Sequence, residues 1–298
     1  MTSKLQDEAL SFFHGDVNNW RTDKVPAEYK GRIKTTLQRN NYILYVIEHR
    51  DETKAVLDVG CGTGDLIHEI ARKGIKGVGV DFVQGMIDVA REKIDHNVMK
   101  DIVFSRASIF DCNYEPESFD VIAANGFVEY LSHEELKHFF DLSFKWLKKG
   151  GSLIFSSRNR LFNIFSLNAL TEPEIKDGTI NKMLLELYAL VNGLRMEKLS
   201  DFDCVDFPDE NARQFNTSKV AVSIRLQYTP AQLAKILRQS NLQTVALSPI
   251  NIHGVLPKFK QDNIDIHWRI ADLLEPHIIE NLLFLAQAST FMVHAKKI

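Results

Sequence analysis

Cysteine is scarce in this chain of 298 residues, and long apolar runs are missing from it. Its three cysteines, Cys61, Cys112 and Cys204, lie far apart, which excludes a disulfide framework and a Cys-x-x-Cys metal site. No apolar run approaches the ~18 residues that a membrane-spanning helix needs. The first eight residues lack the apolar core of a signal peptide. Together these features favour a reducing, cytoplasmic location.

A block of charge of one sign is also missing. The chain has 36 Lys and Arg against 39 Asp and Glu, which gives a net charge of −3. A broad nucleic-acid footprint needs a basic stripe, so we do not expect a nucleic acid as the main partner. The spacing of His133 and His138 does not fit His-Glu-x-x-His, and no metal is expected. The length allows one large domain or two small ones and gives no indication of oligomeric state.

The segment 55–66 is the most informative one that is present. A short β-branched strand runs into a glycine turn with Gly60, Gly62 and Gly64, and a helix follows from Asp65. Glycines let the backbone approach a ligand closely, and the helix start offers N–H groups. Asp81 closes the next strand roughly twenty residues on, where a carboxylate can accept hydrogen bonds from a ribose diol. This pattern predicts a site for a nucleoside-containing cofactor.

The glycine spacing decides which nucleoside motif this is. The dinucleotide fingerprint Gly-x-Gly-x-x-Gly would need a glycine at Asp65, and no Gly-Lys-Ser/Thr follows for a P-loop. The pattern instead resembles motif I of the class I S-adenosylmethionine (SAM) methyltransferases, with Asp58 as the acidic residue two positions before the glycine loop. The resemblance implies SAM as the cofactor. It also implies an α/β fold with a doubly wound, mostly parallel seven-stranded sheet whose last strand is antiparallel.

Strands and helices alternate along most of the chain, which predicts a parallel sheet built from βαβ units. The expected strands are 55–59, 76–80, 101–105, 119–124, 152–157, 243–248 and 291–295. The expected helices are 27–49, 65–73, 84–96, 133–148, 180–191, 230–239 and 268–285. Gly150-Gly151 is expected to end the helix 133–148. Thr229-Pro230 is a helix start signal.

This alternation suggests three parts. Residues 1–50 form an N-terminal helical segment, which begins as a loose polar lead-in over 1–24. Residues 51–157 and 229–298 form the SAM-binding core, and 158–228 form an inserted lid over the substrate. A lid would favour the reaction, because excluding water strengthens the polar contacts around the reacting atoms.

The resemblance assigns parts of SAM to individual residues. Asp58 and the backbone around Gly60, Cys61 and Gly62 should hold the amino-acid part, and Asp81 should bind both ribose hydroxyls. Phe82 can lie against the adenine face or serve core packing, and Met86 is a weaker candidate of the same kind.

Three further cofactor positions follow later strands. Family members often carry an acidic residue after the third strand that accepts from the adenine amino group. This chain has Ser108 there, whose hydroxyl can still accept, and the Ile109 N–H can meet adenine N1. Asn125 ends the fourth strand in a segment that resembles motif IV, and it should lie near the sulfonium.

The acceptor side has catalytic and binding candidates at three strand ends, where open α/β sheets bind ligands. His253 is the best candidate for a general base, although a structural histidine explains it equally well. Tyr130 and His133 follow the fourth strand, and His133 also suits a solvated first helical turn. Arg158, Asn159 and Arg160 can grip a phosphate or carboxylate, or form a surface loop paired with acidic neighbours.

We therefore expect a SAM-dependent methyltransferase that acts on a small polar acceptor, through an oxygen of a sugar or a phosphate-bearing metabolite. Residues 158–168 resemble methyltransferases of bacterial surface-polysaccharide and sugar-modifying pathways. The alternatives are an enzyme that methylates RNA or protein and a non-catalytic SAM-binding scaffold.

Overall fold

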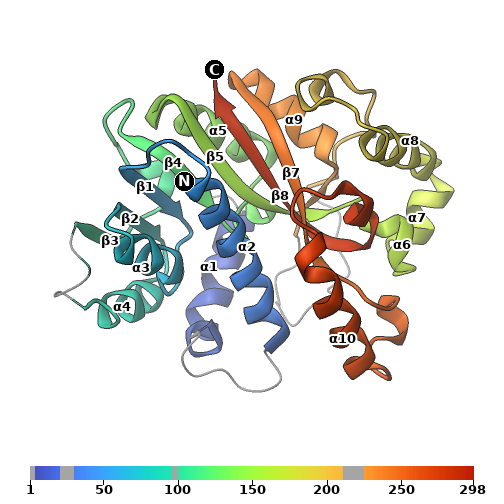
Figure 1. Cartoon of the computed structure of the whole chain (residues 1–298), viewed down its shortest axis with the longest axis horizontal. Coiled ribbons are helices and arrows are strands. Elements are labelled where there is room, and N and C mark those ends of the chain that lie inside the picture. The colour runs from blue at the N-terminus through green and yellow to red at the C-terminus, as the bar shows by residue number, and fades with distance from the viewer. Residues whose placement is uncertain (1–3, 21–29, 96–98, 100, 211–224) are drawn as a thin grey trace.

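A twisted central sheet with the strand order β3-β2-β1-β4-β5-β8-β7 runs through the computed structural model, which describes residues 4–20, 30–95, 99, 101–210 and 225–298 (Figure 1). A short strand, β6, pairs in parallel with β5 beside this path. The strands are β1 Ala55–Val59, β2 Lys76–Asp81, β3 Ile102–Arg106, β4 Phe119–Ala124, β5 Leu147–Asn159, β6 Gln227–Tyr228, β7 Leu242–Ile252 and β8 Ala288–Lys297. Strand β8 is antiparallel to both of its neighbours. The expected sheet is confirmed, with β6 as an addition.

Helices flank this sheet and connect its strands. The α-helices are α1 Lys4–Asp16, α2 Lys30–Glu48, α3 Asp65–Arg72, α4 Gln84–Glu92, α5 His133–Trp146, α6 Phe162–Ser166, α7 Thr171–Lys176, α8 Thr179–Val191, α9 Pro230–Gln239 and α10 Ile264–Leu274. Short 3₁₀ turns include η1 Val17–Trp20, η3 Ile109–Asp111, η4 Val128–Tyr130, η5 Met196–Asp201, η6 Pro257–Phe259, η7 Glu275–His277 and η8 Leu282–Gln287. Among the described helices, none has the length and apolar character to cross a membrane.

Each face of the sheet has its own hydrophobic core. Successive side chains of a strand point to opposite faces, so Val56 and Leu57 belong to different cores. Val56 packs with apolar residues of α2, α3 and α4, and Leu57 packs with residues of α5, α8 and α9. Both side chains are fully buried, and each such burial contributes about 1.5–3 kcal/mol. Helices on both faces make the fold doubly wound, as expected.

Local sequence signals start two of the core helices. Ser132 and Glu135 form a reciprocal capping box at the start of α5. Thr229 and Gln232 do the same for α9, where Pro230 occupies the first helical position. These caps fix the start of α5 after β4 and η4, and the start of α9 directly after β6.

Three expectations about the elements need correction. Helix α5 ends at Trp146, and Gly150-Gly151 lies inside β5, where Gly150 has a φ of 70°. The expected helix 268–285 is broken, because α10 ends at Leu274 and Pro276 cannot continue an α-helix. Residues 4–16 form helix α1 rather than a loose lead-in. Helix α2 begins at Lys30, and residues 27–29 of the expected helix lie outside the described part.

The two ends of the expected insertion, residues 158–228, lie side by side in the sheet. Strand β5 runs on to Asn159, so Arg158 and Asn159 are sheet residues. They pair in parallel with Gln227 and Tyr228 of β6, which ends the insertion. Helices α6, α7 and α8 lie between these two points, beside the core in Figure 1.

Candidate cofactor and acceptor site

The glycine turn after β1 is tied to the neighbouring strand β2. The N–H groups of Gly60 and Cys61 donate to the Val80 carbonyl oxygen at 2.8 and 3.1 Å. The Gly62 N–H donates to Oδ2 of Asp81 at 2.9 Å. A trans peptide points its C=O opposite to its N–H, so the Gly60 carbonyl faces away from β2. The turn can therefore offer a carbonyl oxygen to a cationic group such as an ammonium.

The turn needs glycine for two different reasons. At Gly64 an added Cβ would lie 2.7 Å from the Phe104 ring and 2.9 Å from the Ala90 Cβ, so protein packing excludes a side chain. At Gly62 an added Cβ would meet no protein atom within 4 Å, but φ is +52°, which side chains rarely adopt. Gly64 therefore fixes the start of α3 against β3 and α4, and Gly62 shapes the turn itself.

Two buried carboxyl groups stand beside this turn. Asp58 and Asp81 are 4% and 7% exposed. Burial raises the pKa of Asp81 to about 6, although backbone N–H groups of Val83 and Gly62 partly oppose the shift. Burial also raises the pKa of Asp58 well above its usual range, and the charges of Asp81 and Asp65 add to the effect. Crowded buried carboxylates of this kind are stabilised by a cationic group of a ligand, such as an ammonium.

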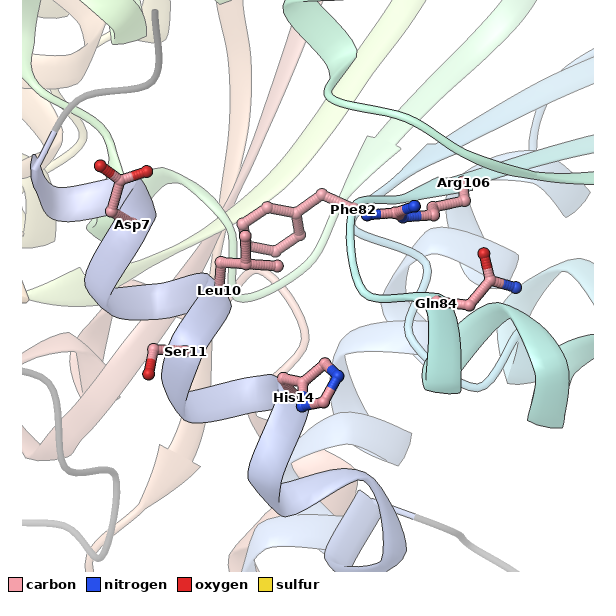
Figure 2. A pocket seen from close by; sticks show the side chains of 7 residues that line it. All are labelled: Asp7, Leu10, Ser11, His14, Phe82, Gln84 and Arg106. Atoms are coloured by element: carbon pink, nitrogen blue, oxygen red, sulfur yellow. The ribbon is translucent and has the colours of Figure 1, made fainter.

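A pocket lies between α1 and the ends of β2 and β3, beside Phe82, the expected adenine contact (Figure 2). Its volume is about 460 Å³, within the range of ligand sites. The Phe82 ring extends from the end of β2 toward Leu10 of α1, and Arg106 lies at the end of β3. The pocket is lined by Asp7, Leu10, Ser11, His14, Phe82, Gln84 and Arg106.

The other expected adenine contacts, Ser108, Ile109 and Met86, make contacts within the protein. The Ser108 Oγ caps η3 by accepting from the Phe110 N–H at 3.4 Å. Ile109 is buried in the core, and Met86 is buried in α4. Their roles toward adenine stay predictions.

Asn125 joins the end of β4 to helix α2. Its Nδ2 donates to the Asn40 Oδ1 at 2.9 Å. Its Oδ1 is buried and has no hydrogen-bond partner within the described part of the chain. A buried acceptor without a partner costs about 1–3 kcal/mol, so this atom points to a ligand that donates. The next residue, Gly126, donates its N–H to the Ser156 Oγ at 2.7 Å.

Beyond Asn125, three arginines lie near the Glu129 carboxylate and the Tyr130 phenol in the part of the chain that the structure describes. This arginine cluster consists of Arg39, Arg158, Arg225, Glu129 and Tyr130. A guanidinium nitrogen of Arg225 lies 3.6 Å from the Glu129 Oε1, and its Cζ lies 5.8 Å from the Tyr130 ring centre. Burial and, as the next cause, the Arg225 charge lower the pKa of Arg158 to about 10. Burial also raises the pKa of the Tyr130 phenol.

The remaining arginine and amide candidates are engaged elsewhere. Arg160 donates to both oxygens of Glu174, at 2.7 and 2.9 Å, inside the insertion. Asn159 donates its amide to the carbonyl oxygens of Leu285 and Ala288. The structure thus brings Arg158 together with Tyr130, and it does not bring Asn159 or Arg160 to them.

The two histidine candidates lie in different surroundings. The His253 ring packs against Phe162 and His267, and burial lowers its pKa to about 3. An imidazole with so low a pKa is neutral at pH 7 and is a weak base. The His133 Nδ1 lies 3.2 Å from Glu210 of the insertion. Neither side chain has a described contact with Asn125, and both catalytic roles stay predictions.

Sequence reasoning missed Arg39, Asn40 and Arg225. Arg39 and Asn40 lie in a helix that precedes the nucleoside motif, and Arg225 lies near the end of the insertion. No spacing rule links these positions, so only the fold brings them to one place. The described residues contain no group of three or more His, Cys, Asp or Glu that could hold a metal ion.

The fold and the site together define a class of protein. A doubly wound sheet carries a glycine turn after β1, an acidic residue at the end of β2 and an amide after β4. These features define a Rossmann-like domain that binds a nucleoside at the carboxyl ends of its strands. The buried carboxyl groups favour a cationic nucleoside over a dinucleotide.

Comparisons with known proteins identify the domain. Residues 56–151 match the family model described as a methyltransferase domain. The chain is 32% identical over 165 residues to a ubiquinone biosynthesis O-methyltransferase of Coxiella burnetii, covering 54% of this chain and 66% of that protein. It is 30% identical over 102 residues to phosphoethanolamine N-methyltransferase 1 of Triticum aestivum, covering 34% of this chain and 20% of that protein. The chain therefore spans only part of the length of these relatives.

The solved structures agree on the fold. Magnesium protoporphyrin IX methyltransferase from Synechocystis PCC 6803, solved with bound SAH, superposes with a TM-score of 0.57 at 12% identity. The match covers 99% of this chain and 100% of that one. The chain thus carries a class I SAM-dependent methyltransferase domain, and the resemblance seen in the sequence is confirmed.

Proposed function

We propose that this protein transfers the methyl group of SAM to a small polar acceptor, through an oxygen of a sugar or a phosphate-bearing metabolite. The observation that carries the proposal is the pair of buried carboxyl groups, Asp58 and Asp81, beside the glycine turn. Such a pair suits a ligand that combines a ribose with a positive charge. SAM supplies a methyl group already activated by its sulfonium.

Each part of the cofactor has matching residues. The Gly60 carbonyl and Asp58 would hold the ammonium, and Asp81 would accept from the ribose hydroxyls. Phe82 would contact adenine from the pocket under α1. The Asn125 Oδ1, which is buried without a described partner, would face the reacting end.

The chain's own residues have three tasks on the acceptor side. They bind the acceptor, orient its nucleophile behind the methyl group, and exclude water. Orientation alone can supply several kcal/mol of barrier reduction. Tyr130 lies in the arginine cluster under α1, where its phenol can donate a hydrogen bond to the acceptor. The insertion 158–228 would cover this side as a lid.

The relatives support a small acceptor. One is named for methylation of phosphoethanolamine and another for ubiquinone biosynthesis. Phosphoethanolamine carries a phosphate, which agrees with the phosphate-bearing class proposed here. The three unpaired thiols of Cys61, Cys112 and Cys204 agree with a reducing, cytoplasmic location.

The experiment has two steps. Calorimetry with S-adenosylhomocysteine (SAH) measures cofactor binding, with Asp81→Ala expected to weaken it at least tenfold. Incubation of labelled SAM with a metabolite extract then measures transfer. A labelled small product supports the proposal, whereas transfer only to RNA or protein would establish the rival enzyme. SAH binding without any transfer would leave the scaffold alternative, and no SAH binding would refute a SAM site altogether.

A further inference from the structure

We propose that the chain has a second binding site, for a phosphate or carboxylate group, formed by His253, Lys260 and His267. This basic cluster shares no residue with the glycine turn or with the arginine cluster. His253 directly follows strand β7, Lys260 directly follows the turn η6, and His267 lies in helix α10. In this site His253 binds an anion rather than acting as a general base.

Close packing holds the two imidazole rings of the basic cluster together. Their ring centres lie 5.3 Å apart. An added Cβ on Gly254 would lie 2.6 Å from the His267 carbonyl oxygen, so the backbone after β7 packs directly on α10. The centre of the His253 ring lies 4.7 Å from that of Phe162 in α6. Strand β7 and helix α10 therefore present both imidazoles at one place, at the carboxyl end of β7.

Polar atoms of these rings lack partners. His253 is 9% exposed, and His267 is fully buried. The His253 Nδ1 and both ring nitrogens of His267 are buried and have no hydrogen-bond partner among the described residues. A neutral imidazole can donate from either nitrogen, depending on its tautomer, and a protonated imidazole donates from both. A ligand that accepts hydrogen bonds can therefore pair with any of these nitrogens.

The charge of the cluster favours an anion among such ligands. The Lys260 Nζ lies 4.9 Å from the centre of the Trp268 ring, and it has no ion-pair partner in the part of the chain that the structure describes. Burial lowers the pKa of Lys260. Burial and, as the next cause, the Lys260 charge lower the pKa of His253 to about 3 and that of His267 to about 4. A bound anion would favour the charged form of all three groups and would oppose these shifts.

A second lysine beside the same tryptophan shows the contrast. The Lys34 Nζ lies 5.6 Å from the centre of the Trp268 ring. It forms ion pairs with Asp272 and Glu275, so these two acids are matched within the protein. A structural lysine therefore has two carboxylate partners here. Lys260 has none among the described residues, which leaves its ammonium able to pair with a ligand.

The experiment titrates inorganic phosphate and, separately, acetate into the full chain saturated with SAH, at pH 7 and constant ionic strength. Bound SAH occupies the cofactor site and keeps the anion out of it. Calorimetry follows binding in the parent and in two variants, Lys260→Gln and His267→Gln. We expect one of the anions to bind at millimolar concentration. Each variant should weaken that binding about tenfold, the effect of one lost charge-assisted hydrogen bond. The anion that binds more tightly identifies the ligand group as phosphate or carboxylate.

SAH affinity within about twofold of the parent shows that a variant is folded. Should the buried substitution His267→Gln prevent folding, Lys260→Gln decides the result alone, because this side chain is only half-buried. The matched control is Lys258→Gln, which removes an exposed lysine two positions away and should leave the anion affinity unchanged. An equal loss in this control would show a diffuse effect of surface charge and would overturn the inference.

The remaining outcomes separate this site from the proposed function. If SAH binds but neither anion does, or if the variants bind the anion as the parent does, the inference is overturned and the proposed function stands. If SAH does not bind, the proposed function fails, and the same titration without SAH still tests the basic cluster.

Discussion

At the scale of single residues, the cofactor site is set by acidic groups that burial makes costly to ionise. Asp58 is the clearest case, because burial and the neighbouring charges of Asp81 and Asp65 all raise its pKa. A residue kept in such a position contributes little to stability and is better explained by binding.

Asp58→Asn is expected to weaken SAM binding at least tenfold, because it removes the carboxylate proposed to face the ammonium. The ligand-free protein should be as stable as the parent or more so at pH 8, since a buried like-charge contact is lost. Calorimetry and thermal unfolding measure the two effects. Asp88→Asn, on the exposed face of α4, is the control and should change neither. Lower stability together with unchanged affinity would show that Asp58 is structural.

At the scale of elements, the turn between β1 and α3 depends on how closely α3 approaches its neighbours. Gly64 has a φ of 78° and no room for a side chain, whereas Gly178 at the start of α8 has a φ of 71° and open space around it. A comparison of the two positions therefore distinguishes the cost of close packing, present only at Gly64, from the cost of backbone strain, present at both.

Gly64→Ala is expected to destabilise the fold by about 2–5 kcal/mol, as the sum of left-handed strain and overpacking. Gly178→Ala should cost only the strain, about 1–2 kcal/mol. Urea unfolding of the two variants measures the difference. Equal losses of stability in the two variants would mean that Phe104 and Ala90 can shift to make room for a side chain at position 64. Close packing would then not be the reason for glycine at this position.

Helix α1 is the second element that bears on function, because it covers both sides of the site. The Phe13 ring lies 5.5 Å from the Tyr130 ring in an edge-on contact, and Ala9 and Phe82 belong to the same apolar cluster. The Thr63 Oγ1 of the glycine turn lies 3.4 Å from the Trp20 carbonyl oxygen of η1. A bound cofactor would therefore lie beneath this segment.

Phe13→Ala is expected to increase the dissociation rate of SAH at least fivefold, because the lost contact loosens α1 over the site. Stopped-flow displacement measures the rate. Leu185→Ala removes a side chain that is 63% exposed on α8 and serves as the control. Identical rates in the parent and in Phe13→Ala would show that the cofactor leaves without movement of α1.

At the scale of the whole molecule, the buried acids couple cofactor binding and stability to pH. Asp81 has a folded pKa of about 6 against an ordinary value of 3.8. The folded state therefore binds more protons than the unfolded state between these values, and stability falls as pH rises through that window. For the ligand-free protein the difference is on the order of 3 kcal/mol.

We expect the ligand-free protein to gain thermal stability from this group as the pH falls from 7 toward 4, before other groups titrate. SAM affinity should change in the opposite direction and weaken about tenfold between pH 7.5 and pH 5, because protonation of Asp81 competes with the cofactor. Thermal unfolding and calorimetry across this range measure both trends. A SAM affinity that is constant with pH would remove the ionised carboxylate from the binding site.

The sequence by itself determined the nucleoside half of this protein. Gly60, Gly62, Gly64, Asp58 and Asp81 lie within one βαβ unit, so their spacing along the chain largely specifies their arrangement in space. Strand alternation and helix caps are local too, and they predicted most of the sheet. Local signals also gave wrong predictions. Gly150-Gly151 resembles the end of a helix, but it lies inside strand β5.

Only the tertiary structure decided the acceptor half. More than a hundred residues separate Arg39 from Arg158, and several tens separate Arg158 from Arg225. No periodicity connects these positions. The tertiary structure likewise paired Arg160 with Glu174 and packed His253 against the Phe162 ring, and burial lowers the His253 pKa. Side-chain burial and charge neighbourhood depend on which distant segments pack together, and a linear spacing rule does not contain that information.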